Sequence, residues 1–234
     1  MLNAELINYG DSGLLIRFSE KYSEDNWKKT HFLTNEIRKE NIEGILSIVP
    51  TLTSIFIHFD LLIINRANLI DRIKRIMEEI NDKKIVLKSK HYKIPIAFGG
   101  EYGPDIDLIA EEVNKSREDL IQSLTSIPKQ ILCFSRGPMM ESPINESVKR
   151  VSSPRQSVPA GTLGIAFGQI SISSMDAPSG WKMLGQSPVT LLDPNLNPPG
   201  ILSPGDYLEF FAIEKNDFDY YKSQPIERVD VGNE

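Results

Sequence analysis

The sequence contains few of the residues that build disulfide frameworks and metal centres. Its 234 residues include one cysteine, Cys133, and three histidines, which are scattered along the chain. One cysteine cannot form an intramolecular disulfide, and a lone thiol with scattered histidines lacks the ligand spacing of a zinc site. We therefore expect a reducing compartment and no metal centre.

Long apolar runs and an excess of positive charge are also missing. No apolar stretch is long enough to cross a bilayer, and residues 1–11 lack the basic start and apolar run of a signal peptide. The formal net charge is -6, whereas nucleic acid binding requires clustered Lys and Arg. These absences predict a cytoplasmic protein with a small molecule or a protein as partner, and with no nucleic acid or membrane partner.

What the sequence does contain is an ordinary globular balance, with 40% hydrophobic and 25% charged residues. In the first third of the chain, short alternating segments and amphipathic segments follow one another. The predicted strands are 4–8, 12–18, 45–49 and 54–59, and the predicted helices are 23–39 and 68–80. This order of elements predicts an α+β domain, in which two helices cover one face of an antiparallel sheet.

A polar break at residues 81–84 precedes a region of different texture. The pattern there predicts strands at 85–88 and 92–98, followed by helices at 104–113 and 116–124. From residue 127 onward, Pro, Gly and Ser separate short apolar strands at 163–172, 189–192 and 207–213, which is typical of a closed or partly closed β-barrel. Residues 215–234 are polar without apolar periodicity, which predicts a loosely held tail.

Several segments resemble one known family, and they occur in the family's order. In the first half these are Tyr-Gly-Asp-Ser-Gly-Leu-Leu at 9–15 and Val-Pro-Thr-Leu-Thr-Ser-Ile-Phe-Ile-His-Phe-Asp at 49–60. The most specific stretch begins Ser-Pro-Arg-Gln-Ser-Val-Pro-Ala-Gly-Thr-Leu-Gly at 153 and continues with Ala-Pro-Ser-Gly-Trp-Lys at 177. The chain thereby resembles the family of allophanate hydrolase subunit 1 and the 5-oxoprolinase B subunits, which includes carboxyltransferase-type subunits.

The resemblance implies a fold, an activity and a partner. It implies a ferredoxin-like α+β domain at 1–85, a mostly-β cyclophilin-like barrel at 86–214 and the polar tail at 215–234. The implied function is that of a B-type subunit of an ATP-dependent amide or lactam hydrolase, such as a 5-oxoprolinase. ATP is then a ligand of the complex, and a homologous partner subunit supplies the matching barrel of a composite site, so the isolated chain is not expected to turn over.

The sequence also departs from the family's pattern. Leu124 stands where relatives usually carry a histidine, and residues 133–140, Cys-Phe-Ser-Arg-Gly-Pro-Met-Met, replace a loop rich in glycine and aromatic residues. Gln186 and Ser187 replace an Arg-Thr pair, so one cation of the family is missing. These departures support an alternative, in which the chain is a non-catalytic regulator or scaffold similar to the family's sporulation-kinase inhibitor branch.

Three residues are candidates for substrate binding. Arg155 lies in a Pro-Arg-x-x-Val-Pro-Ala-Gly loop, where a guanidinium binds a carboxylate or phosphate, or braces the loop. Gln169 interrupts an apolar strand, and its amide is either a ligand contact or a structural hydrogen bond. Trp181 follows a rigid Pro-Ser-Gly turn, and its ring either floors a pocket or packs in the core.

No residue stands out as a catalytic base or nucleophile. The histidines lie on a predicted helix, a predicted strand and a basic linker, and apolar neighbours favour an inert, buried Cys133 thiol. Catalytic residues therefore stay unassigned. The loop at 133–140 separates the two hypotheses: an open pocket beneath it with Arg155 and Trp181 favours catalysis, and a filled pocket favours a regulator.

Overall fold

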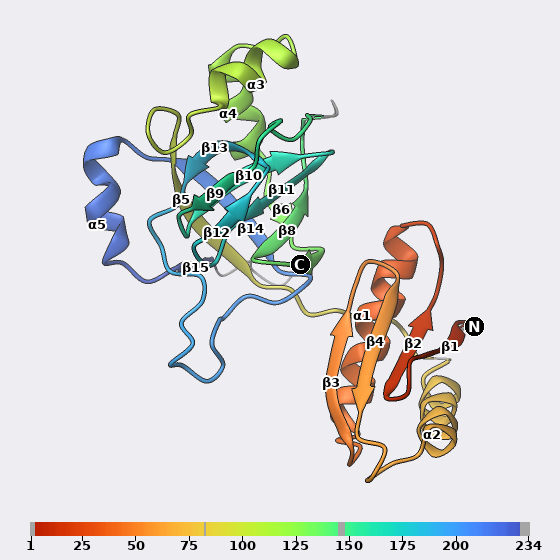
Figure 1. Ribbon diagram of the computed structural model, residues 1–234. Helices are drawn as coiled ribbons and strands as arrows, with labels where there is room; N and C mark the ends of the chain where they lie inside the picture. The colour runs from red at the N-terminus through yellow and green to blue at the C-terminus, as the bar shows by residue number, and fades with distance from the viewer. Residues whose placement is uncertain (1–2, 82, 145–147, 230–234) are drawn as a thin grey trace. The chain divides into compact units, whose positions relative to one another are not determined.

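The computed structural model describes residues 3–81, 83–144 and 148–229, and the chain divides into two compact units, Met1–Leu87 and Lys88–Glu234 (Figure 1). It is a mixed α/β protein whose larger sheet curls into a half-barrel. Within the described residues, no helix combines the length and the apolar character needed to cross a membrane.

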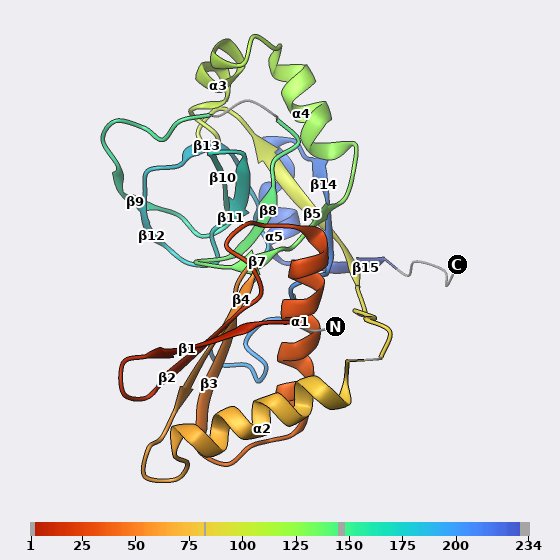
Figure 2. The ribbon, with the colours of Figure 1, turned by 90° about the vertical axis from the view of Figure 1, so that its right-hand side faces the viewer.

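The N-terminal unit is a four-stranded antiparallel sheet with the strand order β1-β2-β4-β3 and two helices on one face (Figure 2). Its strands are β1 (Glu5–Tyr9), β2 (Gly13–Arg17), β3 (Ile45–Pro50) and β4 (Ser54–Phe59), and its helices are α1 (Glu24–Lys39) and α2 (Arg66–Glu79). The observed order ββαββα is the order that the hydrophobic spacing predicts.

Local sequence explains each element of this unit. The Ser23 and Asn65 side chains accept hydrogen bonds from backbone N–H groups three residues later, and so cap the first turns of α1 and α2. Along β4, Ile55, Ile57 and Phe59 alternate with polar or half-exposed neighbours and are fully buried against the helices. The core thus forms from one face of the sheet.

The C-terminal unit is built on a nine-stranded sheet, with a further two-stranded ribbon and two helices over one end of the curl (Figure 2). The principal order is β6-β14-β5-β13-β10-β11-β8-β7, and β15 pairs with β5 beside it. The sheet strands are β5 (His91–Phe98), β6 (Lys129–Gln130), β7 (Cys133–Phe134), β8 (Pro138–Glu141), β10 (Thr162–Ala166), β11 (Gln169–Ile172), β13 (Lys182–Gln186), β14 (Tyr207–Ala212) and β15 (Glu227–Val229). The ribbon pairs β9 (Arg155–Val158) with β12 (Ala177–Ser179), and the helices are α3 (Ile106–Glu112) and α4 (Arg117–Thr125).

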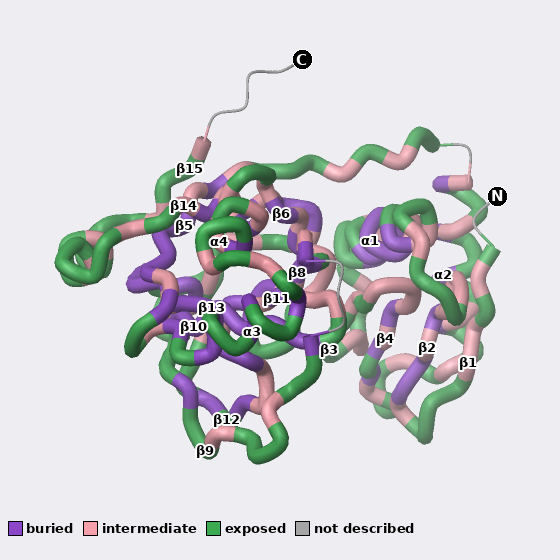
Figure 3. The backbone as a smooth tube through the Cα atoms, turned by 90° about the horizontal axis from the view of Figure 1, so that it is seen from above, coloured by how far each residue is buried: buried purple, intermediate pink, exposed green. Residues whose placement is uncertain are grey.

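The core of this unit lies inside the curl, where β10 and β13 are buried along almost their whole length (Figure 3). Ile109 and Leu120 from the helices join Ile165 and Leu184 from these strands in one cluster. The strands β6 and β7, at the two ends of the sheet order, are separated in the chain by Ile131 and Leu132 alone. One short segment therefore bonds to both edges of the curled sheet.

Three segments differ from the predictions. Residues 163–172 form two strands instead of one, because Phe167 and Gly168 both have positive φ angles of 52° and 73° and turn the chain into the β10–β11 hairpin. Residues 85–88 and 189–192 contain no strand. Val189 and Leu191 are nevertheless buried in the core, which explains why their apolar pattern resembled a strand.

The prediction of a loosely held tail at 215–234 is also wrong over the described part of that segment. It contains the 3-10 helix η1 (Lys215–Asp217), the helix α5 (Phe218–Lys222) and β15. The Phe218 ring stacks on Tyr102 with centroids 4.4 Å apart, and β15 bonds to the start of β5, where β13 does not reach. Backbone pairing and ring stacking hold this segment, and neither produces an apolar periodicity in the sequence.

Candidate functional site

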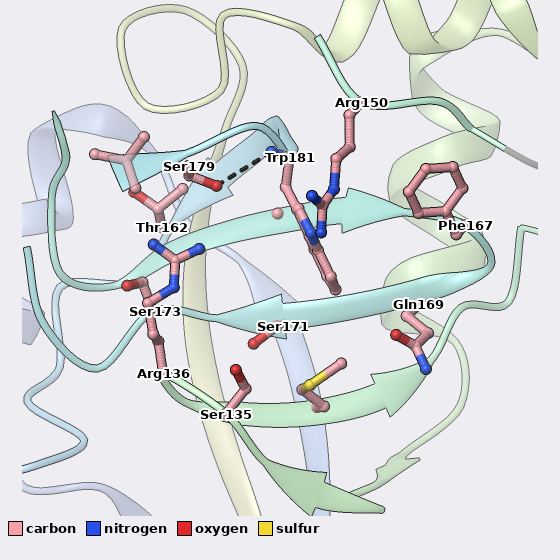
Figure 4. A pocket seen from close by; sticks show the side chains of 13 residues that line it. Ser135, Arg136, Arg150, Thr162, Phe167, Gln169, Ser171, Ser173, Ser179 and Trp181 are labelled. Atoms are coloured by element: carbon pink, nitrogen blue, oxygen red, sulfur yellow. Dashed lines mark hydrogen bonds between the residues drawn. The ribbon is translucent and has the colours of Figure 1, made fainter. Parts of the chain in front are cut away.

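A cavity of about 270 Å³ opens on the C-terminal unit, against β10, β11 and the segment before β8 (Figure 4). Its walls combine two arginines, one indole ring, six polar side chains and a few apolar surfaces. The lining residues are Ser135, Arg136, Met139, Arg150, Val158, Thr162, Gly164, Phe167, Gln169, Ser171, Ser173, Ser179 and Trp181.

Strand alternation supplies the polar floor. Gln169, Ser171 and Ser173 line the cavity, whereas Ile170 and Ile172 between them are fully buried in the core. Successive side chains of a strand point to opposite faces, so one strand serves both the core and the cavity. This period of two is visible in the sequence from Gln169 onward and is the signal that sequence analysis missed.

Trp181 lies where β10 leaves room for its ring. An added Cβ on Gly164 would stand 3.2 Å from the Trp181 Cβ, which is tighter than ordinary van der Waals contact. The Trp181 backbone N–H donates to the Ser179 hydroxyl oxygen at 3.1 Å, the interaction drawn as a dashed line in Figure 4. The missing side chain at Gly164 therefore permits the indole to form a wall.

The two arginines come from different segments. Arg150 lies over the Phe167 ring with 5.7 Å between the guanidinium carbon and the ring centroid, a cation–π contact. Arg136 donates to the backbone carbonyl of Pro178, and its own carbonyl accepts the Ser174 N–H at 2.9 Å. In Figure 4, Arg136 lies at the end of the cavity near Thr162 and Ser173, and Phe167 and Gln169 lie at the other end.

The charge of the lining has one sign. No Asp, Glu or His is found among the lining residues that the structure describes, although the chain as a whole carries a net charge of -6. Two guanidinium groups beside hydroxyl and amide groups can bind an anion, and the indole face can contact a flat or apolar part of the same ligand. The same lining holds no general base for chemistry on that ligand.

The structure brings Gln169 and Trp181 together at the cavity, and it places Arg155 elsewhere. The Arg155 guanidinium pairs with the Asp105 carboxylate at 2.7 Å, and the other oxygen of that carboxylate accepts the Met183 N–H at 2.7 Å. Arg155 therefore holds β9 to the segment before α3, which is the bracing role that its loop also allowed. Whether Gln169 and Trp181 bind a ligand stays a prediction.

The loop at 133–140 does not fill the cavity. It contributes Ser135, Arg136 and Met139 to the lining, so the loop that departs from the family's pattern still borders open space beside Trp181. Cys133 does not line the cavity, and burial raises the pKa of its thiol. Leu124 is fully buried in the core, so an apolar contact replaces any polar role at that position.

The remaining titratable groups offer no metal centre within the described ranges. Among residues 3–81, 83–144 and 148–229, no group of three or more His, Cys, Asp or Glu side chains is arranged to hold an ion. The chemistry of the cavity therefore rests on its cationic, hydroxyl, amide and aromatic groups.

Comparisons with known proteins agree with the sequence motifs. Residues 4–202 match the sequence model of a family described as the carboxyltransferase domain, subdomain C and D. Over 230 residues the chain is 29% identical to the 5-oxoprolinase B subunit of Bacillus subtilis (strain 168), and the match covers 92% of this chain and 95% of that protein.

Two crystal structures share the fold. TTHA0988 matches with a TM-score of 0.73 and 23% identity, covering 86% of this chain but 40% of that chain. The urea amidolyase of K. lactis matches with a TM-score of 0.73 and 19% identity, covering 97% of this chain and 16% of that chain. At these identities the likeness shows the fold alone, and both proteins are much longer than this chain.

Proposed function

Because the chain belongs to the carboxyltransferase domain family, subdomain C and D, we propose that it is the B-type subunit of an ATP-dependent amide or lactam hydrolase with 5-oxoproline as the substrate class. The N-terminal unit would correspond to a ferredoxin-like domain and the C-terminal unit to a cyclophilin-like barrel. The cytoplasm is the compartment that this function requires.

One observation carries the proposal, namely a cavity with two arginines and an indole but no carboxylate in its described lining. 5-Oxoproline has a carboxylate and a flat lactam ring, and these two parts match a guanidinium and the Trp181 face. Gln169 and the serine hydroxyls can donate to the lactam oxygen, where negative charge develops when the ring is opened. Gln169 and Trp181 are then ligand contacts, and Arg155 braces the adjacent ribbon.

The cavity supplies binding groups only, so the reaction requires further groups from outside this chain. ATP would phosphorylate the lactam oxygen with release of ADP. Water would then add to the activated carbon and the C–N bond would break, which opens the ring, and a second water would release phosphate from the resulting acyl phosphate. A homologous partner subunit would contribute the base and the phosphate site. The arginines of this chain would orient the substrate through its carboxylate, and Gln169 and the serine hydroxyls would stabilise the charge that develops on the lactam oxygen.

The test is 5-oxoproline-dependent ATP hydrolysis, measured for the chain alone and for the chain co-expressed with its partner subunits. We expect no turnover by the chain alone. In the complex, the Arg136→Gln and Arg150→Gln variants should each bind 5-oxoproline about tenfold more weakly, as expected for the loss of a charge-assisted contact.

Arg117→Gln is the matched control, because Arg117 lies in the same unit and outside the cavity lining. Turnover by the isolated chain would contradict the need for a partner. Equal affinity in the wild type and both cavity variants would show that the substrate binds elsewhere.

A second candidate function is a non-catalytic regulator or scaffold, and the burial of Leu124 in the core favours it. In that case the complex would bind an anionic ligand without hydrolysing ATP. Binding of 5-oxoproline by a complex that shows no turnover, with all partner subunits present, would favour the regulator.

A further inference from the structure

An ion pair with a buried lysine lies beside Trp181 and outside the lining of the cavity. The Lys182 side chain keeps 8% of its surface exposed, and its ammonium group contacts the Glu112 carboxylate at the end of α3. A lysine is rarely this buried unless it is paired, because removing the charge from water is unfavourable. The pair therefore fixes the first residue of β13 to α3.

The same carboxylate also holds the segment that carries Arg150. One Glu112 oxygen pairs with Lys182, and the other accepts the Lys149 backbone N–H at 3.3 Å. The segment 148–151 has no regular secondary structure of its own. Two further backbone bonds fasten it, from the Phe167 N–H to the Val148 carbonyl at 2.8 Å and from the Val151 N–H to the Gly180 carbonyl at 2.9 Å. Arg150 thus lies between backbone positions that hydrogen bonds hold on both sides.

The ion pair also determines where the indole points. Trp181 directly precedes Lys182, and neighbouring side chains on an extended chain point to opposite faces. Because Lys182 points toward Glu112, Trp181 faces the cavity, where Gly164 leaves space for it. In Figure 4, the side chains of Arg150 and Trp181 extend toward the strand that carries Gln169 and Ser171.

We propose that Glu112 is a positioning residue for the cavity, which fixes the cation Arg150 through Lys149 and the ring of Trp181 through Lys182. Glu112 does not touch the ligand. It preorganises one charged wall and one aromatic wall, so that an anion meets both without rearrangement. This inference rests on the proposed function, in which the cavity binds an anion.

Intrinsic fluorescence gives a direct test on the full chain. The sequence has two tryptophans, and Trp27 is fully buried, so a quencher in solution reaches Trp181. Iodide is the anionic probe and acrylamide the neutral one. A guanidinium close to the ring raises the local iodide concentration by about threefold, whereas acrylamide is indifferent to charge.

The decisive variant combines Glu112→Ala with Lys182→Met, which leaves the net charge unchanged and leaves no unpaired buried charge. The ratio of iodide to acrylamide quenching should fall by about threefold, because Arg150 no longer has a fixed place near the ring. Pairing Glu112→Gln with Lys182→Met retains an acceptor for the Lys149 N–H and should give an intermediate ratio. Glu101→Ala with Lys215→Met removes a Lys–Glu pair of the same unit, away from the cavity, and should match the wild type.

The outcomes separate the two claims. If the wild type shows no preference for iodide, the cavity does not attract anions and the proposed function fails with the inference. If the wild type prefers iodide and the Glu112→Ala, Lys182→Met variant does so equally, Glu112 has no positioning role and the proposed function stands. If that variant does not fold, the Glu112→Gln, Lys182→Met variant is measured instead. A ratio of iodide to acrylamide quenching equal to that of the wild type would then overturn the inference.

Discussion

The two units differ in where their long-range polar contacts lie. In the N-terminal unit, Ser23 and Asn65 bond to residues three positions away. In the C-terminal unit, Asp105 and Arg155 pair across 50 residues, and Glu112 and Lys182 across 70. The first unit caps its helices locally and makes its long-range side-chain contacts at exposed positions, as in the Arg66 bond to the Gly10 carbonyl, whereas the second joins distant segments through partly buried carboxylate pairs.

The burial of charge shows the same contrast. The buried polar residues of the N-terminal unit are Thr30, His31 and Thr34 among those described, and the carboxylate of its Lys29–Asp25 pair is exposed. The C-terminal unit buries Asp105 and Lys182 next to the cavity. A desolvated pair is costly to break but holds its partners in one geometry, which suits the walls of a binding site.

The largest expected effect concerns the independence of the units. Phe59 is fully buried in the N-terminal core, and Phe59→Ala should lower the free energy of unfolding of that unit by about 3–5 kcal/mol. Urea unfolding followed by fluorescence reports the N-terminal unit through Trp27 and the C-terminal unit through Trp181. The transition of the C-terminal unit should not move, and Phe59→Leu should cost about 1 kcal/mol. Equal destabilisation of both transitions would show one cooperative body.

The next effect compares a buried acid with an exposed one. Asp105→Ala leaves Arg155 and the Met183 N–H without their acceptor, and it should cost about 2–3 kcal/mol because Arg155 is partly solvated. Asp25→Ala removes an exposed carboxylate from its pair with Lys29 and should cost about 0.5 kcal/mol. Urea midpoints measure both, and similar losses would remove the distinction between the units.

Smaller effects are expected in the response to acid. The hydrogen bond from Lys182 lowers the pKa of Glu112, and the hydrogen bond from Lys39 lowers the pKa of Glu36 in the N-terminal unit. A depressed carboxyl pKa adds stability above the unfolded value of about 4.3, and this stability is lost as the pH falls through the folded pKa.

The free energy of unfolding should therefore depend less on pH below about 4.3 in Glu112→Gln for the C-terminal unit and in Glu36→Gln for the N-terminal unit. Urea titrations between pH 5 and about 3 measure these slopes. An unchanged slope in either variant would mean that its carboxylate is not stabilised by the lysine.

The smallest effect is one of reactivity. Burial raises the pKa of the Cys133 thiol, so the reactive thiolate is scarce at neutral pH. Alkylation by iodoacetamide in the native protein should be slower than alkylation of free cysteine, and it should reach the free rate in urea. A native rate equal to that of free cysteine would show that the thiol is exposed and activated.

The contrast between local and distant contacts also explains what the sequence could predict. Capping residues and apolar spacing lie within a few positions of each other, so the helices that follow Ser23 and Asn65 could be placed from the sequence. Family motifs identified Gln169 and Trp181. Arg136 and Arg150 were not identified from the sequence, because each lies in an irregular segment and only the fold brings it to the cavity.

Other misses have equally specific causes. The turn at Phe167 and Gly168 requires positive φ at a bulky residue, which sequence propensity does not favour, so one strand was predicted where two exist. Arg155 was identified by its loop, but its partner Asp105 lies 50 residues earlier and nothing local marks the pair. β15 depends on the edge that β13 leaves free at the start of β5, which no residue of β15 itself reveals.

The pairing of the first half of β5 with β15 and β14 determines how the C-terminal unit would bear tension. Val229 lies opposite His91 in the antiparallel pair, so a pull on the chain at Lys88 and Val229 loads one end of β15 and peels its bonds singly. The parallel neighbour β14 runs from Tyr207 opposite His91 to Ala212 opposite Ile96. Once β15 has detached, the force acts on the start of β5 and the end of β14, so it runs along both strands and strains all their hydrogen bonds together. Under tension, β15 should therefore detach from β5 at low force, and the pairing of β14 with β5 should resist until a higher force is reached.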